Sequence, residues 1–345
     1  MPDWSQGIPL EYTRALCDYW LSDYDWRRCE ASLNGFAQFR TELDGLDIHF
    51  LHVRSPQEDA TPLVMTHGWP GSIVEFRKVI GPLTDPVAHG GDAADAFHLV
   101  CPSLPGYGFS GKPTKAGWSI TRTADAWDQL MTRLGYPRYG AQGGDWGAQV
   151  TTGLGIRHGA NLIGIHLNMP IVLPDPDTMG DLTEQEQGAL AGLKYYQDWD
   201  SGYSKQQSTR PQTIGYGLVD SPAGLCAWIV EKFWSWTDCD GDPANVLTRD
   251  EMLDNVMLYW LTAAGASSAR MYWESFRTPL LGPIECAVGC SVFPKEIFRG
   301  SRRWAEKQFA ELRYWNEPDR GGHFAAFEQP EIFVQEVRAA FRAFR

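Results

Sequence analysis

The chain has few basic side chains: 30 of its 345 residues are Lys or Arg, against 43 Asp or Glu, which gives a formal net charge of −13. Proteins that bind nucleic acids cluster Lys and Arg on one face, and here these residues are scattered, so no nucleic-acid partner is expected. No apolar run approaches the ~18 residues of a membrane-spanning helix. There is no internal repeat or low-complexity segment, and a hydrophobic content of 43% is sufficient for a large core. These absences leave a folded globular protein as the expected class.

Signals for export are also missing. The first residues, Met-Pro-Asp-Trp-Ser, have neither the basic nor the apolar region of a signal peptide. Seven cysteines form no Cys-x-x-Cys pair, and an odd, unpatterned set of this kind favours reduced thiols. We therefore expect a cytoplasmic protein without a membrane anchor.

Short apolar segments alternate with helical ones over much of the chain. Strands are expected at residues 47–53, 62–66, 97–101, 139–142, 162–168, 284–290 and 312–315. Helices are expected at residues 10–21, 121–134 and 146–158 and from residue 331 onward, and no strand is expected in residues 1–45. The alternation predicts an α/β protein with a mostly parallel central sheet that helices flank on both faces.

This alternation stops near Pro170 and resumes at Ile284. The intervening sequence is helical, rich in aromatic residues and broken by Pro and Gly. A helical block between two parts of a sheet predicts a cap over the carboxyl ends of the strands, where ligands bind in such folds. We therefore divide the chain into an N-terminal segment (1–60), a first core part (61–173), a helical cap between the sixth and seventh strands (174–282) and a second core part (283–345).

The motif Gly143-Gly144-Asp145-Trp146-Gly147 follows the strand expected at 139–142. It has the Gly-x-x-x-Gly frame of a nucleophile elbow, with a carboxylate in place of serine. A carboxylate is ionised at pH 7 and is suited to displacement at a strained or activated sp³ carbon, which leaves an ester for water to cleave. The motif thus predicts hydrolysis of an epoxide or an alkyl halide. The alternative is a glycine-rich turn in which Asp145 only caps the following helix.

An ester on Asp145 requires a general base, and His323 is the candidate because it lies in a Gly-rich loop between the last strand and the last helix. A histidine base is usually held by a carboxylate. Glu296 follows the strand at 284–290 and gives the order nucleophile, acid, histidine that is typical of this architecture. Glu285 starts the same strand at the wrong end, and Asp319 remains the second choice. For Glu296, the alternative is a charge at a helix N-terminus.

Hydrolysis of the ester passes through an oxyanion, which backbone N–H groups commonly stabilise. The N–H group of Trp146, after the nucleophile, is one expected donor. The other should come from the loop that begins at His67, where Pro70 cannot donate, so we expect Trp69 N–H. For His67 itself we expect a hydrogen bond that shapes the loop.

Four segments and the N-terminal region carry a resemblance to a known family. The sequence resembles the epoxide hydrolases of the microsomal and juvenile-hormone type, which belong to the α/β-hydrolase superfamily and have an N-terminal epoxide hydrolase domain. The matching segments are residues 67–72 (His-Gly-Trp-Pro-Gly-Ser), 102–110, 143–147 and 321–328, together with residues 24–27 and 39–41 near the N-terminus. The resemblance extends over nearly the whole chain.

The resemblance implies an α/β-hydrolase fold with a helical cap, no cofactor and no metal. It places the nucleophile on Asp145, the acid on Glu296, the base on His323 and two cap tyrosines on Tyr203 and Tyr272. Two phenols can polarise an epoxide oxygen and supply a proton, but the residues alone leave other cap tyrosines open: Tyr195, Tyr196 and Tyr259. The side chains expected to contact the substrate are those of Trp69, Pro70, Trp146 and Phe324.

The function expected from these residues is opening of an epoxide to a vicinal diol through an ester on Asp145. A haloalkane dehalogenase that uses the same nucleophile is one alternative, and a non-catalytic homologue that binds a ligand is another. The partners expected are a small-molecule epoxide and water, and a homodimer is left open. The aromatic cap favours a bulky apolar, aromatic or natural-product epoxide, in detoxification or secondary metabolism. The sequence does not select the substrate, the carbon attacked or the product stereochemistry.

Overall fold

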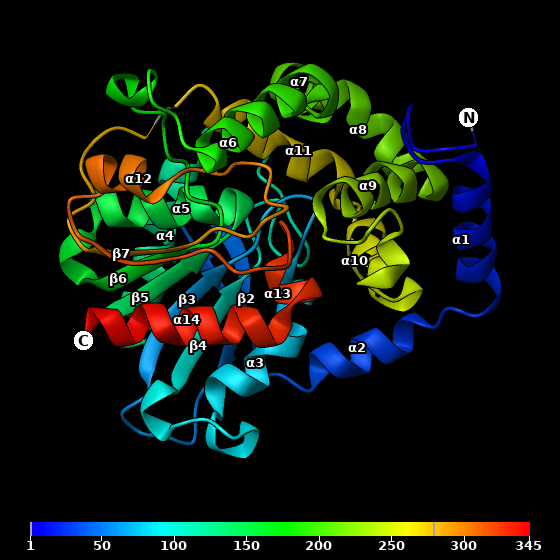
Figure 1. The fold of residues 1–345 in the computed structure, drawn as a ribbon. Coiled ribbons are helices and arrows are strands. Elements are labelled where there is room, and N and C mark those ends of the chain that lie inside the picture. The colour runs from blue at the N-terminus through cyan, green and yellow to red at the C-terminus, as the bar shows by residue number, and fades with distance from the viewer. Residues whose placement is uncertain (1, 279) are drawn as a thin grey trace.

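The computed structural model describes residues 2–278 and 280–345. These residues form an eight-stranded sheet with the strand order β1-β2-β4-β3-β5-β6-β7-β8 (Figure 1). The strands are β1 (Gln38–Leu43), β2 (Leu46–Val53), β3 (Thr61–Thr66), β4 (Phe97–Pro102), β5 (Tyr139–Gly143), β6 (Leu162–Leu167), β7 (Ala287–Ser291) and β8 (Leu312–Asn316). β2 is antiparallel to β1 and to β4, and the other neighbours are parallel. The predicted mostly parallel sheet is confirmed.

Two strands differ from the prediction. The expectation of no strand in residues 1–45 is wrong, because β1 forms the edge of the sheet. As an edge strand, β1 keeps most of its side chains accessible, so it shows no apolar alternation. The turn that follows it, Asp44-Gly45, has φ values of 48° and 76°, the left-handed geometry of a tight hairpin, and this pair was its sequence signal. In addition, β7 begins at Ala287 rather than at 284.

Helices cover both faces of the sheet. Figure 1 shows α3 (Arg77–Thr84) and α14 (Pro330–Phe344) along one face and α4 (Ile120–Arg133) and α5 (Asp145–Arg157) along the other. Two short helices, α12 (Arg302–Gln308) and α13 (Ala325–Glu328), flank β8 in sequence. Single 3₁₀ turns are η1 (Ile73–Phe76), η2 (Val87–His89), η3 (Ala93–Asp95), η4 (Gly159–Asn161), η5 (Pro176–Thr178) and η7 (Pro243–Asn245). The core of the molecule is therefore the sheet between two helical layers.

A second helical block lies between β6 and β7 in sequence and packs above the sheet in Figure 1. Its elements are α6 (Glu184–Tyr195), the π-helical turn η6 (Tyr196–Asp200), α7 (Gly202–Thr209), α8 (Pro211–Asp220), α9 (Pro222–Trp236), α10 (Arg249–Leu261) and α11 (Ala264–Ser275). We call these elements the cap helices. They lie within the range predicted for a cap.

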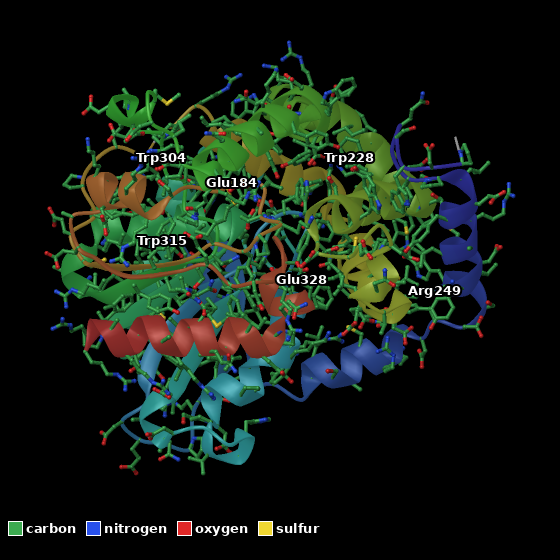
Figure 2. All side chains as sticks on the ribbon, viewed as in Figure 1. Glu184, Trp228, Arg249, Trp304, Trp315 and Glu328 are labelled. Carbon is green, nitrogen blue, oxygen red and sulfur yellow. The ribbon has the colours of Figure 1, made fainter. Side chains whose placement is uncertain are left out.

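The N-terminal helices α1 (Leu10–Ser22) and α2 (Trp26–Asn34) run along the outside of the cap helices (Figure 1). The buried Asp254 of α10 accepts a hydrogen bond from Tyr24 Oη at 2.8 Å and pairs with Arg28 at 3.1 Å and with Arg77 at 2.8 Å. Arg249 of α10, which is labelled in Figure 2, has its guanidinium group over the ring of Tyr19. The N-terminal segment thus connects the cap helices to α3 of the core.

Among the described residues, no helix combines the length and the apolar character required to cross a bilayer. In the same part of the chain, no group of three or more His, Cys, Asp or Glu residues is arranged to hold a metal ion. The seven cysteines are free thiols.

Candidate active site

The predicted elbow is formed where β5 ends and α5 begins. Asp145 has a φ of 49°, a left-handed conformation that non-glycine residues adopt rarely and that is typical of a strained nucleophile turn. The turn depends on close backbone approach, since a Cβ atom on Gly147 would lie 2.6 Å from the carbonyl carbon of Thr66 on β3. Asp145 therefore stands at the carboxyl ends of the central strands, with its side chain largely buried.

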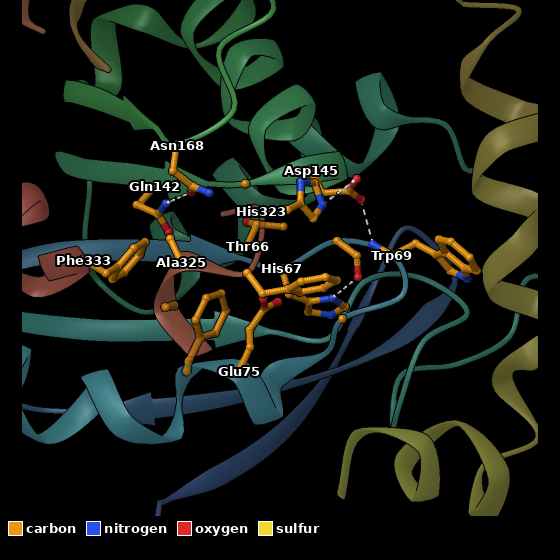
Figure 3. Close-up of a pocket in the computed structure, with 16 residues that line it drawn as sticks. Thr66, His67, Trp69, Glu75, Gln142, Asp145, Asn168, His323, Ala325 and Phe333 are labelled. Carbon is orange, nitrogen blue, oxygen red and sulfur yellow. Dashed lines mark hydrogen bonds and ion pairs between the residues drawn. The ribbon is translucent and has the colours of Figure 1, made fainter. Parts of the chain in front are cut away.

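His323 meets Asp145 from the other part of the core (Figure 3), and Glu296 contacts the opposite nitrogen of the His323 ring. His323 Nε2 lies 3.4 Å from Asp145 Oδ2, and His323 Nδ1 lies 2.7 Å from Glu296 Oε1. Both Glu296 and His323 are buried, whereas the two alternatives for the acid, Glu285 and Asp319, are exposed. The structure thus brings together the three residues predicted from chain order.

Burial lowers the pKa of the His323 imidazole, but the charge of Glu296 and the contact with Asp145 more than offset this, so the pKa lies well above its usual value. The protonated form of His323 is therefore favoured at its position between Asp145 and Glu296. A cap residue fixes its backbone, because His323 N–H donates to the Trp236 carbonyl oxygen at 2.8 Å, and the Trp236 ring lies 4.9 Å from the imidazole. The cap helices thus help to orient the histidine.

Trp69 provides the predicted backbone contact to the nucleophile. Its N–H group donates to Asp145 Oδ1 at 2.7 Å, which leaves Oδ2 as the oxygen nearer His323. The Trp146 N–H group belongs to the first turn of α5. Backbone N–H groups in this turn have no acceptor within the helix, so they stabilise a negative charge placed near them. His67 bonds to the Gly68 carbonyl oxygen and accepts from Leu104 N–H, so it shapes the loop as expected.

The same two tryptophans hold the two predicted tyrosines. The ring of Trp69 stacks on Tyr203 with centroids 4.7 Å apart, and the ring of Trp146 meets Tyr272 edge-on, also at 4.7 Å. Tyr203 and Tyr272 are themselves 5.8 Å apart. Burial, followed by nearby tyrosines and the Asp145 charge, raises the pKa of both phenols well above its usual value. Both side chains are therefore neutral hydroxyl donors facing the nucleophile.

The other cap tyrosines have different surroundings. Tyr195 is exposed, and Tyr259 Oη donates to the Gly71 carbonyl oxygen at 2.8 Å, so it holds the loop. Tyr196 Oη lies 3.0 Å from Tyr203 Oη. Among the described residues, Tyr272 Oη is buried without a hydrogen-bond partner, and its hydroxyl group is free to bind a ligand.

A cavity of about 550 Å³ separates the nucleophile from the cap helices. Asp145, Trp146, Tyr196, Tyr203 and Tyr272 line it, and most of the remaining lining is apolar: Ile120, Met169, Ile171, Leu193, Phe276, Leu280, Ile297 and Phe298. We call it the large cavity. It has the size and character of a small-molecule site.

Of the four side chains expected to contact substrate, Trp146 lines the large cavity. Trp69 and Phe324 instead border a much smaller cavity around Asp145 and His323, and the Phe324 ring packs on Phe233. The Pro70 carbonyl oxygen accepts a hydrogen bond from an asparagine of α10. Of these four residues, Trp146 is thus the one that lines the large cavity, and the other three have different surroundings.

Two ionisable side chains near the site were not identified from the sequence. Lys232 of α9 is buried, pairs with Asp200 at 2.6 Å, and lies 4.8 Å from the centre of the Tyr203 ring. Glu75 of η1 points into the smaller cavity (Figure 3). Both residues lie in helical sequence, where Lys and Glu usually face solvent. The sequence therefore gives no sign that either side chain is buried near the site.

The chain was compared with known families and proteins. The family description "Epoxide hydrolase N terminus" matches residues 1–76, and "alpha/beta hydrolase fold" matches residues 61–208. A Stigmatella aurantiaca protein named as a candidate epoxide hydrolase is 58% identical over 344 residues, which cover 99% of this chain and 78% of that protein. Epoxide hydrolase 1 of Sus scrofa is 36% identical over 96% of this chain and 80% of its own length.

Two solved structures are similar over nearly the whole chain. The epoxide hydrolase of Aspergillus niger has a TM-score of 0.89 at 36% identity, covering 99% of this chain and 87% of that one. The juvenile hormone epoxide hydrolase of Bombyx mori has a TM-score of 0.88 at 30% identity, with the same coverage. The predicted α/β-hydrolase fold is confirmed.

Proposed function

The chain belongs to the epoxide hydrolases of the microsomal and juvenile-hormone type, and from this premise we propose that it acts through a covalent ester on Asp145. The enzyme is an epoxide hydrolase, which converts an epoxide and water to a vicinal diol. The observation that carries the proposed mechanism is the position of the Asp145 carboxylate. It lies between the His323–Glu296 pair and two buried phenols across the large cavity.

Ring opening begins with Asp145 Oδ2. Because Oδ1 accepts the Trp69 N–H group, Oδ2 is the oxygen left to attack an epoxide carbon from the side opposite the breaking C–O bond. Tyr203 and Tyr272 line the large cavity and donate hydrogen bonds to the ring oxygen. One of them transfers its proton as the C–O bond breaks, which yields a hydroxyalkyl ester and a tyrosinate. A halide leaving group requires no proton, so the tyrosine pair favours an epoxide over a haloalkane.

Ester formation also prepares the base. The ester carries no charge, so the contribution of Asp145 to the raised pKa of His323 is lost. The imidazolium then releases its proton, which restores the tyrosinate to a phenol, and neutral His323 can accept a proton from water. The electrostatic change thus makes the histidine a base after ring opening and not before it.

Hydrolysis returns every group to its starting state. The water oxygen bonds to Asp145 Cγ, and one water proton moves to His323 Nε2. The N–H groups of Trp69 and Trp146 stabilise the negative charge on Oδ1, a role typically worth about 3–4 kcal/mol per donor. When the ester C–O bond breaks, the second water proton ends on the departing alcohol. Asp145 is again a carboxylate and His323 is again protonated.

The large cavity supports a bulky, mainly apolar epoxide as the substrate. Its volume of about 550 Å³ lies within the range of small-molecule sites, and its walls are mostly aliphatic and aromatic. Asp145 and the tyrosines line the part of the cavity where the epoxide ring would lie.

Trapping the ester tests this mechanism. In His323→Gln the ester should form but should not be hydrolysed, so one equivalent of epoxide should add its full mass to the peptide that contains Asp145. The matched control is His89→Gln, at an exposed histidine that lines neither the large cavity nor the smaller one, which should turn over normally without accumulating ester. The mechanism is wrong if His323→Gln carries no adduct, or an adduct on another residue.

A further inference from the structure

A second, much smaller cavity lies against Asp145 on its core side (Figure 3). We call it the rear cavity. Its volume of about 20 Å³ is sufficient for roughly one water molecule. Its lining includes the polar side chains of Thr66, His67, Glu75, Gln142, Asp145, Asn168 and His323. Asp145 lines both cavities, so it lies between the large cavity and the rear one.

Two buried oxygen atoms at the rear cavity are unpaired. In the described part of the chain, Glu75 Oε1 and Gln142 Oε1 are both inaccessible to solvent and have no hydrogen-bond partner. The other end of the Gln142 amide is fixed, because Nε2 donates to Asn168 Oδ1 at 2.8 Å. Buried polar atoms without protein partners commonly bind ordered water. Two such acceptors on one water-sized cavity therefore indicate a water site.

The position of this site fits the second half of the reaction. Once the ester forms, its alkyl group occupies the large cavity, on the same side as Tyr203 and Tyr272. Water that attacks Asp145 Cγ then requires another approach, and it must also reach His323. The rear cavity touches both Asp145 and His323 and is not lined by the two tyrosines.

We propose that the rear cavity binds the hydrolytic water, and that Glu75 is the residue that holds this water for attack on the ester. The inference rests on the proposed function. The water donates one proton to His323 Nε2 and the other to Glu75 Oε1 as a hydrogen bond. Its oxygen lone pair then points at Asp145 Cγ. As the O–Cγ bond forms, the first proton transfers to His323, and the second stays with the water oxygen until the alcohol departs.

Glu75 can fill this role without adding a charge. Burial raises the pKa of its carboxyl group to about 8, against the lowering effect of the His323 charge, so the group is neutral at pH 7. A neutral carboxyl group offers an acceptor oxygen, and it does not repel the oxyanion that develops on Asp145. The fit around it is close, because a Cβ atom on Gly71 would lie 2.9 Å from Glu75 Oε1.

The test separates the two chemical steps in the full-length enzyme. Rapid mixing with an epoxide in excess gives the rate of ester formation, and chemical quenching followed by mass spectrometry of the Asp145 peptide gives the rate of its hydrolysis. Glu75→Leu removes the acceptor, Glu75→Gln keeps a neutral acceptor of the same shape, and Glu58→Leu is the control at an exposed glutamate.

In Glu75→Leu we expect hydrolysis to slow about 100-fold while ester formation stays within about threefold of the parent, so that ester accumulates and kcat and KM fall together. In Glu75→Gln, hydrolysis should proceed within about threefold of the parent's rate, because the amide keeps a neutral acceptor oxygen and holding the water requires no charge. Glu75→Ala, which also removes the acceptor but leaves a smaller side chain than leucine, should slow hydrolysis selectively as well and provides a second variant if Glu75→Leu does not fold.

The proposal is overturned if Glu75→Leu slows ester formation and ester hydrolysis equally, or if it leaves the rate of hydrolysis unchanged. A parent enzyme that forms no ester would instead overturn the mechanism on which the proposal rests. The two failures are therefore distinguishable in one experiment.

Discussion

Replacing Gly68 with alanine should disable ester formation while the fold is retained. A Cβ atom at this position would lie 2.6 Å from Asp145 Cγ and closer still to its Oδ1 and Cβ atoms. Ordinary contacts of a Cβ atom begin near 3.4 Å. Rotation of the aspartate side chain does not move its Cβ atom, so the loop that carries residue 68 and the elbow must move apart.

The size of the effect follows from that displacement. The loop and the carboxyl group must separate by about 1 Å, a misplacement that commonly costs about 100-fold in rate. The same movement lengthens the bond of 2.7 Å between Trp69 N–H and Asp145 Oδ1. Loss of one such donor costs about 100- to 1000-fold, or roughly 3–4 kcal/mol. We therefore expect kcat/KM to fall by at least about 100-fold.

The assay is steady-state hydrolysis of an epoxide, combined with thermal unfolding of each variant. Gly188→Ala in α6 is the matched control, because its added Cβ atom would meet nothing within 4 Å. It should keep full activity and gain slightly in stability, by up to about 1 kcal/mol. A Gly68→Ala enzyme with the parent's kcat/KM would refute the close approach of this loop to the nucleophile.

Three further substitutions test separate parts of the site. Tyr272→Phe should reduce ester formation more than hydrolysis in rapid mixing, and the double variant with Tyr203→Phe should abolish it; equal loss in both steps would contradict a role in ring opening. Glu296→Gln removes a contribution that raises the pKa of His323. Since only neutral histidine is a base and its neutral fraction grows with pH, the inflection of ester hydrolysis should move to lower pH, and an unmoved inflection would count against the pairing. Lys232→Met leaves a buried carboxylate unpaired, so the free energy of unfolding should fall by about 3–5 kcal/mol in denaturant titration, and an unchanged value would show that the pair is not stabilising.

The nucleophile, base and acid could be predicted because their signals lie in short segments and in chain order. The elbow follows a strand directly, and His323 follows the last strand, so the topology of a parallel sheet brings both to one edge. Glu296 follows the neighbouring β7 in the same way. These side chains depend on strand ends, which the apolar pattern locates well.

The positions of the other site residues depend on tertiary packing, which no short sequence pattern predicts. Tyr203 and Tyr196 are neighbours on the cap. Only the folded structure shows that Tyr203 stacks on Trp69 and that the hydroxyl group of Tyr196 contacts the hydroxyl group of Tyr203. Glu75 and Lys232 stand in helical segments beside apolar residues, where the sequence cannot distinguish a buried charge from a solvated one. Edge strand β1 was missed for a related reason, because its exposed residues give no apolar alternation.

The central claim is that an oxygen of Asp145 becomes part of the diol. A single turnover in H₂¹⁸O, with enzyme in excess over a chiral epoxide, measures this directly. The account predicts that the first diol carries no ¹⁸O and that the label appears in the carboxyl group of the peptide containing Asp145. Diol fully labelled in the first turnover, with unlabelled Asp145, would show that water attacks the epoxide itself and would contradict the account.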